Sequence, residues 1–339
     1  PDLIRKFYKR ELTERIFKSN IFKKEDLEAG GGNEQSHTRS FLKIQDGCNS
    51  FCTFCIIPYA RGKSRSIGIA DLVSRIKDLE QQGRKEIVLT GVHIGDYEDV
   101  QNGNQKTLED LVEAILIKTN ISRIRLSSLE PVELTDRLLE LYSDERLCPH
   151  FHMSIQSANT DVLFQMKRKY TQDDVVIALH KIYRKLKNPF VGMDVIAGFP
   201  TETQEQFDDT YKILCDLPWT KMHVFPYSER HGTRAAVLEQ IPFHVRKERA
   251  SILRTLSQHR YQAEMLKQID RLDEVLILND ETIYDGVVYR EALTKNYWPV
   301  LVPQDDHYVA GAQQKIKIIK GADIDNEYRL IAESVSLCV

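Results

Sequence analysis

The sequence predicts an α/β fold in which a parallel, helix-covered sheet is followed by a small antiparallel β-barrel. Six short apolar runs between residues 41 and 227 alternate with segments of helical periodicity, which is typical of parallel βα units. After residue 271 the helical pattern stops, and short β-type runs follow one another between Asp, Asn and Gly turns. In a fold of this kind, ligand-binding groups are expected at the carboxyl ends of the parallel strands.

The expected elements follow from these patterns. Strands are predicted at residues 41–45, 85–90, 123–128, 151–156, 190–199 and 221–227. Helices are predicted at about 70–82, 107–119, 135–143, 159–187, 203–216 and 243–270. The β-type runs of the last segment are EVLIL, DGVVY, WPVLVP and QKIKIIK. We therefore expect a domain boundary near residue 270.

Three regions are expected on this basis: a linker or remnant of an upstream region at 1–35, an α/β domain at 36–270, and a β-barrel at 271–339. The first region combines a possible helix over 1–22 with the Gly-rich stretch 29–35. The apolar positions of that helix would be Ile4, Phe7, Leu12 and Phe17. Because the chain begins with Pro1 and not with Met, we expect it to be part of a longer protein.

Composition excludes several classes. A formal net charge of −3 gives no global basic field that would indicate nucleic-acid binding. No apolar run approaches the roughly 18 residues of a membrane span, so no membrane partner is expected. Six cysteines are too few for a disulfide scaffold in a chain of 339 residues. A reducing, cytoplasmic location is the resulting expectation.

The most informative stretch is DGCNSFCTFCIIPYARGKSRS, residues 46–66, which directly follows a predicted strand. Cys48, Cys52 and Cys55 have the spacing C-x3-C-x2-C, and three thiolates on one tight loop can bind three irons of a cubane cluster. The fourth iron would stay open for the amino and carboxylate groups of S-adenosylmethionine. Phe54 would then lie against that ligand. Zinc, held by the three thiolates with His37 or His93, is the alternative, although zinc sites usually carry a second Cys pair. We interpret Cys148, Cys215 and Cys338 as ordinary isolated cysteines.

Six segments of the chain, the cysteine loop among them, together resemble the radical S-adenosylmethionine methylthiotransferase family. They occur in the family's order and lie between residues 41 and 240. The resemblance is strongest to the branch that acts on N6-threonylcarbamoyladenosine in tRNA. The matching segments are residues 46–66, KEIVLTGVHIGDY (85–97), IRLSSLEP (124–131), MKRKYT (166–171), DVIAGFP (194–200) and HVFPYSERHGTRAA (223–236). The tail resembles TRAM, the small RNA-associated β-barrel that ends these enzymes.

The resemblance implies a partial (β/α)6 radical-SAM barrel in which Cys48, Cys52 and Cys55 are the cluster ligands and the catalytic residues. It places Thr90 and Gly91 at the methionine amino group and Gln156 and Ser157 at the ribose. Asp194 and Gly198 would flank the fifth strand end, and Phe225 would lie near the adenine. Two positions depart from the family pattern, because Thr201 and Ala158 stand where glycine is usual.

The resemblance also implies partners and a second cofactor. Methylthiotransferases carry an upstream domain with an auxiliary [4Fe–4S] cluster, and residues 1–40 contain no cysteine to bind one. An electron donor such as flavodoxin or ferredoxin is implied as well. The tRNA phosphates would be met by two basic groups near the barrel mouth, unless these merely form solvated surfaces. The two groups are Arg61, Lys63 and Arg65, and Lys167, Arg168 and Lys169.

Three other functions stay open at this point. Residues 271–339 hold seven Lys and Arg against twelve Asp and Glu, and such an acidic barrel would suit a basic ribosomal-protein substrate. Isopentenyladenosine in tRNA is the substrate of a neighbouring branch. A module that only binds RNA is the non-enzymatic alternative, and the intact three-cysteine loop argues against it.

Overall fold

The computed structural model describes residues 38–101, 103–304, 309–324 and 327–335. The expectations for the segment 1–35, for His37 and for Cys338 lie outside these residues. Within the described part of the chain, no helix has the length and apolar character needed to cross a membrane.

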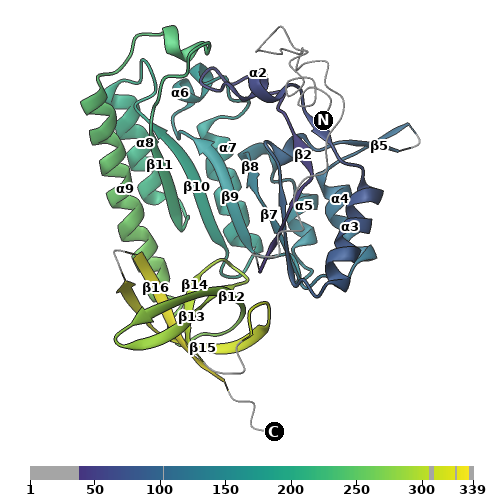
Figure 1. The fold of residues 1–339 in the computed structure, drawn as a ribbon. Helices are drawn as coiled ribbons and strands as arrows, with labels where there is room; N and C mark the ends of the chain where they lie inside the picture. The colour runs from purple at the N-terminus through teal and green to yellow at the C-terminus, as the bar shows by residue number, and fades with distance from the viewer. Residues whose placement is uncertain (1–37, 102, 305–308, 325–326, 336–339) are drawn as a thin grey trace, which may run out of the picture.

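Two parallel sheets form the first part of the molecule (Figure 1). One has the order β1-β4-β7 and the other the order β11-β10-β9-β8. The strands are β1 (Ser40–Lys43), β4 (Glu86–Thr90), β7 (Arg123–Leu126), β8 (Ser128–Leu129), β9 (His150–Gln156), β10 (Phe190–Ala197) and β11 (Lys221–Pro226). The six runs that predicted strands all contain one, which confirms the α/β assignment.

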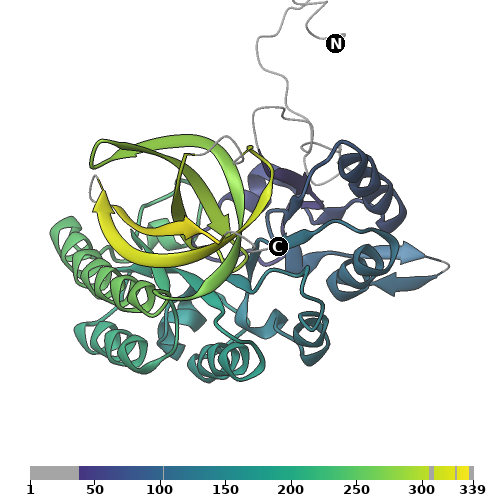
Figure 2. The same cartoon turned by 90° about the horizontal axis from the view of Figure 1, so that it is seen from below.

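Helices cover the outer side of these sheets in an arc, which is seen best from below (Figure 2). They are α3 (Ile69–Gln81), α4 (Leu108–Lys118), α5 (Asp136–Leu141), α6 (Thr160–Gln165), α7 (Gln172–Lys185), α8 (Gln204–Asp216) and α9 (Phe243–Leu266). In α3, the apolar residues Leu72, Val73, Ile76 and Leu79 recur at helical spacing and are all buried. Thr107, Thr171 and Thr203 begin α4, α7 and α8 with capping boxes, which satisfy amide groups that a helix start leaves free.

The single helix predicted over 159–187 is wrong. The chain forms α6 and α7 there, separated by residues 166–171. Lys167 adopts a φ of 61°, and this left-handed conformation cannot continue a right-handed helix. The break turns residues 167–169 back toward the cysteine loop. Two short antiparallel pairs were also not predicted, namely β2 (Gln45–Asp46) with β3 (Arg65–Ser66) and β5 (Asp99–Gln101) with β6 (Asn104–Lys106).

The C-terminal part is a closed β-barrel with the strand order β12-β13-β14-β16-β15. Its strands are β12 (Leu272–Tyr284), β13 (Val287–Thr294), β14 (Pro299–Pro303), β15 (Gln313–Ile324) and β16 (Glu327–Ser334). The last strand was not among the predicted runs. Trp298 is buried in the barrel's apolar core, which Phe190 of β10 and Tyr261 of α9 also join. The two parts therefore share one apolar cluster.

A buried charge cluster also joins the two parts. Glu86 of β4 lies between Arg123 and Arg125 of β7, and Arg123 Nε is 2.8 Å from Glu86 Oε2. The two guanidinium groups donate hydrogen bonds to the carbonyl oxygens of Leu293 and Lys295 in the C-terminal barrel, both at 3.0 Å. Burial raises the pKa of the Glu86 carboxyl, but Arg125 and Arg123 outweigh this effect and lower the pKa overall. Charge pairing thus fixes the barrel beneath the sheets.

Candidate active site around the cysteine loop

The cysteine loop lies between β2 and α2 (Ile57–Arg61), at the carboxyl end of the strands (Figure 1). Gly47 opens the loop with a φ of 79°, and a Cβ there would lie 2.1 Å from the carbonyl oxygen of Lys63. Only glycine fits this position. Thr53 anchors the middle of the loop, because its amide and hydroxyl donate hydrogen bonds to the carbonyl oxygens of Met166 and Gln165. The loop is therefore held against the end of α6.

Cys48, Cys52 and Cys55 are free thiols on this loop, and two of the three sulfurs have cationic neighbours. Arg168 Nη1 donates a hydrogen bond to Cys52 Sγ at 3.2 Å. His93 Nδ1 lies 3.7 Å from Cys48 Sγ, and the Ser50 amide donates to the same sulfur at 3.4 Å. Burial raises the pKa of the Cys48 thiol, but these hydrogen bonds outweigh it and lower the pKa overall. The loop thus stabilises a thiolate at Cys48, whereas burial raises the pKa of the Cys55 thiol.

His93 is surrounded by carboxylates. Its ring nitrogens lie 3.2 Å from Asp96 Oδ2 and 3.5 Å from Glu130 Oε1, and Glu133 is also in contact. Burial alone would lower the pKa of His93, but the hydrogen bonds with Asp96, Cys48 and Glu133 raise it to about 12. His93 is thus a cation held beside Cys48. It had been considered only as a zinc ligand, and its role as a sulfur neighbour was not predicted.

Glu130 connects the two cationic neighbours of the sulfurs. Its carboxylate lies 3.2 Å from Arg168 Nη2 and faces His93 on the other side. Arg168 is further fixed by the carbonyl oxygen of Ser154 at 2.7 Å and by the hydroxyl of Tyr170. The result is a continuous chain of charges from Cys48 to Cys52, made by residues that are 37 or more positions apart in the sequence.

The three sulfurs do not all lie as close together as a single zinc ion would require. Among the described residues, the three sulfurs do not form a group that lies entirely within 4.8 Å. Tetrahedral zinc, with Zn–S bonds of about 2.3 Å, would bring thiolates to roughly 3.8 Å from one another. A cubane carries each thiolate on a different iron and spaces them more widely. Ligand atoms of Cys48, His93 and Asp96 do lie within 4.8 Å of one another, but this group contains only one of the three loop cysteines.

The other predicted site residues are placed with mixed outcomes. Gly91 follows Thr90 at the end of β4, and a Cβ on Gly91 would lie 2.9 Å from Gln45 Oε1. Gly91 is therefore required because Gln45 leaves no room for a side chain there. Gln45 is fully buried, accepts a hydrogen bond from the His93 amide at 2.9 Å and donates to the Gly47 carbonyl oxygen at 2.7 Å. This support of the loop by Gln45 had no signal in the sequence.

The two residues expected at the ribose, Gln156 and Ser157, lie at the end of β9. Gln156 ends the strand with a φ of 61°. Ser157 is only 1% exposed, and its hydroxyl contacts Thr210 Oγ1 of α8 at 3.4 Å. Its side chain faces the helix layer, and the expected contact with a ribose stays a prediction. Ala158, at the second departure from the family pattern, is fully buried.

The remaining predicted site residues lie along β10 and β11 and in the turn that follows β10. Asp194 Oδ2 lies 2.9 Å from His152 Nε2 on the inner side of the sheet. Gly198 has a φ of 72° and abuts Arg246 of α9. Phe225 is 52% exposed, whereas Phe54 packs edge-on against Phe199. Phe54 thus packs against the apolar cluster that contains Phe199.

The two basic groups divide into surface and interior residues. Lys63, Lys167 and Lys169 are exposed, as is Arg61, which lies 3.9 Å from Asp46. Arg65 is mostly buried and bonds to the carbonyl oxygens of Arg61 and Lys63. The side chain of Arg168 is only 6% exposed and its donors are used inside the site. We therefore expect the phosphates to be met by the exposed residues of the two groups and not by Arg168.

Comparison with known proteins agrees with this geometry. Residues 42–214 match the radical SAM superfamily. The chain is also 36% identical over 327 residues to threonylcarbamoyladenosine tRNA methylthiotransferase MtaB of Bacillus subtilis (strain 168), covering 93% of this chain and 69% of that protein. The chain belongs to the radical SAM methylthiotransferase family. Membership of the radical SAM superfamily implies a [4Fe–4S] cluster and S-adenosylmethionine as cofactors.

Other relatives of this radical SAM chain carry related names. MtaB of Rickettsia prowazekii (strain Madrid E) is 39% identical over 81% of this chain and 63% of its own length. MtaB of Aquifex aeolicus (strain VF5) is 41% identical over 76% of this chain and 61% of its own length. A tRNA-2-methylthio-N(6)-dimethylallyladenosine synthase of Geobacillus thermodenitrificans (strain NG80-2) is 35% identical over 72% of this chain and 47% of its own length. The chain thus spans less than two thirds of the length of several curated relatives that it matches.

Proposed function

We propose that this chain supplies the radical-generating part of a methylthiotransferase that modifies carbon 2 of N6-threonylcarbamoyladenosine beside the tRNA anticodon. The observation that carries the proposal is the cysteine loop with its charged surroundings, in a chain whose MtaB relatives match it at 34–41% identity. Each of those five relatives is named as a threonylcarbamoyladenosine tRNA methylthiotransferase.

Cys48, Cys52 and Cys55 would hold the cluster as thiolates. When bound, the cluster and S-adenosylmethionine supply radical chemistry through reductive cleavage of the sulfonium bond. The remaining work falls to the chain's own residues. His93 and Arg168 hold positive charge at two of the sulfurs, and Glu130 fixes both cations in place.

Other residues near the loop suit the rest of the cofactor. Next to Cys52, Arg168 carries a positive charge and Glu130 a negative charge, and these charges complement the carboxylate and the ammonium group of methionine. We propose these two residues for the methionine moiety. Thr90, Gly91, Gln156, Asp194, Gly198 and Phe225 remain candidates for the methionine, the ribose and the adenine.

The finer description of the fold belongs to the same proposal. The two parallel sheets would be the halves of a partial (β/α)6 barrel whose inner side receives the target nucleoside. The closed barrel of β12 to β16 would be a TRAM domain, with regions 36–270 and 271–339 as separate domains. The whole enzyme would use a second [4Fe–4S] cluster and an electron donor such as flavodoxin or ferredoxin. The described cysteines outside the loop, Cys148 and Cys215, are isolated from one another and give that second cluster no set of ligands.

Two observations favour other substrates. The relative named as a dimethylallyladenosine synthase points to isopentenyladenosine in tRNA. The acidic composition of residues 271–339 points to a basic protein. We favour threonylcarbamoyladenosine because two MtaB relatives share 39% and 41% identity with the chain, whereas three dimethylallyladenosine synthases share 33–36%.

The test uses cells in which the complete protein is the only methylthiotransferase. Nucleosides of bulk tRNA are analysed by mass spectrometry, beside cells that carry Cys52→Ala in the same protein. The proposal predicts 2-methylthio-threonylcarbamoyladenosine with the unchanged protein and its absence with the variant. Methylthiolation confined to isopentenyladenosine, or to a ribosomal protein, would contradict the substrate assignment.

A further inference from the structure

The inner side of the sheets ends in a cavity at the point where it meets the C-terminal barrel. This floor cavity has a volume of about 440 Å³ and is lined by residues that include His150, His152, Lys221, His223, Tyr297 and Arg329. The first four begin or line β9 and β11, and the last two come from the C-terminal barrel. The cavity is therefore made jointly by both parts of the molecule.

Strand register places the floor cavity below the cysteine-loop end of the sheets. Gly192 of β10 pairs with Lys221, Asp194 pairs with His223, and Ile196 pairs with Phe225 near the upper end. Because a strand rises about 3.3 Å per residue, Lys221 lies roughly 13 Å and His223 roughly 7 Å below Phe225 along β11. Strand β11 therefore leads from Phe225 near the rim to Lys221 at the floor cavity.

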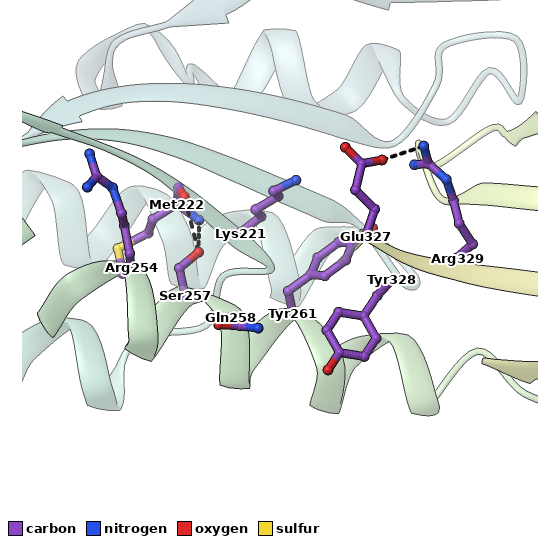
Figure 3. A pocket seen from close by; sticks show the side chains of 9 residues that line it. All are labelled: Lys221, Met222, Arg254, Ser257, Gln258, Tyr261, Glu327, Tyr328 and Arg329. Atoms are coloured by element: carbon purple, nitrogen blue, oxygen red, sulfur yellow. Dashed lines mark hydrogen bonds and ion pairs between the residues drawn. The ribbon is translucent and has the colours of Figure 1, made fainter. Parts of the chain in front are cut away.

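The chemistry of the floor cavity suits an anion. Lys221 Nζ lies 4.9 Å over the ring of Tyr261 and has no carboxylate within 4.0 Å in the described part of the chain. Arg329 is paired with Glu327, and these residues also border a second cavity of about 450 Å³, which Lys221 and Tyr261 line as well (Figure 3). Asp194, the carboxylate on the inner side, is already paired with His152.

The floor also contains a stacked pair of rings and a ring nitrogen that lacks a hydrogen-bond partner among the described residues. Tyr297 stacks on His150 with ring centroids 4.1 Å apart, and Arg125 lies over its ring at 4.9 Å. His150 is 8% exposed, and its Nδ1 atom has no hydrogen-bond partner among the described residues. A buried ring nitrogen without a partner is uncommon and calls for a polar group that the protein itself does not supply.

We propose that the floor cavity binds the threonylcarbamoyl arm of the target adenosine, with Lys221 and Arg329 as the residues that recognise its carboxylate. This inference rests on the proposed function and adds the basis of its substrate choice. The arm is about as long as two extended residues, roughly 7 Å, which reaches the level of His223, and the long side chain of Lys221 would extend upward from its lower position to meet the carboxylate. Its polar carbamoyl group would offer hydrogen-bonding atoms near His150, and its carboxylate matches the cations. An isopentenyl arm carries no charge and no polar atom for His150.

The test measures binding of the complete, cluster-loaded protein to anticodon stem-loop RNAs by fluorescence anisotropy. The RNAs differ only at the target base, which is adenosine, threonylcarbamoyladenosine, the carboxamide of that nucleoside, or isopentenyladenosine. We expect the carboxylate form to bind roughly tenfold tighter than the carboxamide. Lys221→Met and Arg329→Met should each reduce this ratio toward one.

Lys212→Met is the matched control, because Lys212 is an exposed lysine on the outer helix α8. It should preserve the ratio of carboxylate to carboxamide binding. Lys221→Arg, which keeps the positive charge, should retain most of that ratio. Iron content and melting temperature establish that each variant is folded. A full preference for the carboxylate in both Lys221→Met and Arg329→Met would overturn the cavity assignment alone. An unchanged protein that binds all four RNAs equally would overturn the proposed substrate, and the cavity assignment with it.

Discussion

Arg168 donates a hydrogen bond to the sulfur of Cys52 at 3.2 Å, although the two residues are 116 positions apart. The contact exists because Lys167 breaks the helix between α6 and α7 and turns the following residues toward the cysteine loop. It makes Arg168 part of the surroundings of the proposed cluster.

Replacement of Arg168 by Met should lower the reduction potential of the cluster. Reduction adds negative charge, and a cation at a ligand sulfur stabilises the reduced form. We expect a shift on the order of 50 mV, measured by a redox titration followed by electron paramagnetic resonance. Lys169→Met, an exposed neighbour on the same loop, serves as the control and should leave the potential unchanged. Equal potentials in both variants would refute a role of Arg168 at the sulfur.

Glu86→Gln should destabilise the protein strongly. The side chains of Glu86 and Arg123 are fully buried and that of Arg125 is 2% exposed, so the change leaves two buried cations without their carboxylate. Removing one partner of such a buried pair costs about 3–5 kcal/mol of unfolding free energy. Urea denaturation measures the loss.

Glu113→Gln is the control for that experiment. Its partner Arg137 lies at 2.8 Å, but the two side chains are 47% and 48% exposed. An exposed ion pair contributes about 1 kcal/mol or less. Equal losses for the two variants would contradict the role of burial in the Glu86 cluster.

Thr201→Gly should stabilise the protein. Thr201 stands at a position where the family usually has glycine, and it adopts a φ of 70°. A β-branched residue is strained in this region by about 1 kcal/mol or more. The loss of its exposed hydrogen bond with Gln165 offsets little of that gain. The melting temperature of the apoprotein should therefore rise.

Gly198→Ala should have the opposite effect. Gly198 also has a positive φ, and a Cβ there would lie 2.8 Å from Arg246 Cγ and 3.0 Å from Arg246 Cα. Both the backbone conformation and the packing oppose a side chain. If Gly198→Ala were as stable as the unchanged protein, the close packing of α9 on this turn would be wrong.

Lys167 and Lys169 should contribute to tRNA binding, whereas Arg168 between them should not do so through phosphates. Each phosphate contact adds about 0.7 to 0.9 to the slope of log affinity against log salt. Replacing both lysines by Met should weaken binding and flatten that slope, with the iron content unchanged. A slope that stays the same would mean that the two lysines are merely solvated.

The sequence was sufficient for the order of elements and for the cysteine loop, because both depend on local patterns. Apolar periodicity predicted the strands and most helices, and the spacing of Cys48, Cys52 and Cys55 pointed to a cluster. It failed at residues 159–187, where a single left-handed residue divides an otherwise helical pattern. It also missed β16, whose strand partners lie elsewhere in the barrel.

The surroundings of the site could not be predicted because they depend on tertiary contacts. Nothing local distinguishes Arg168 from Lys167 or Lys169, yet the first is interior and the other two are exposed. Ser157 looked like a polar strand end, and its hydroxyl is used by Thr210. Glu130 and Gln45 carry no motif, and their importance follows only from what they contact.

The most direct test of the account is a measurement of metal content after anaerobic reconstitution with iron and sulfide. The unchanged chain should bind about four irons and four sulfides, as expected for one [4Fe–4S] cluster. Its electron paramagnetic resonance signal, once reduced, should change when S-adenosylmethionine is added. Cys48→Ala, Cys52→Ala and Cys55→Ala should each lose the cluster. A chain that binds zinc and no iron, or a single variant that retains the full cluster, would contradict the account.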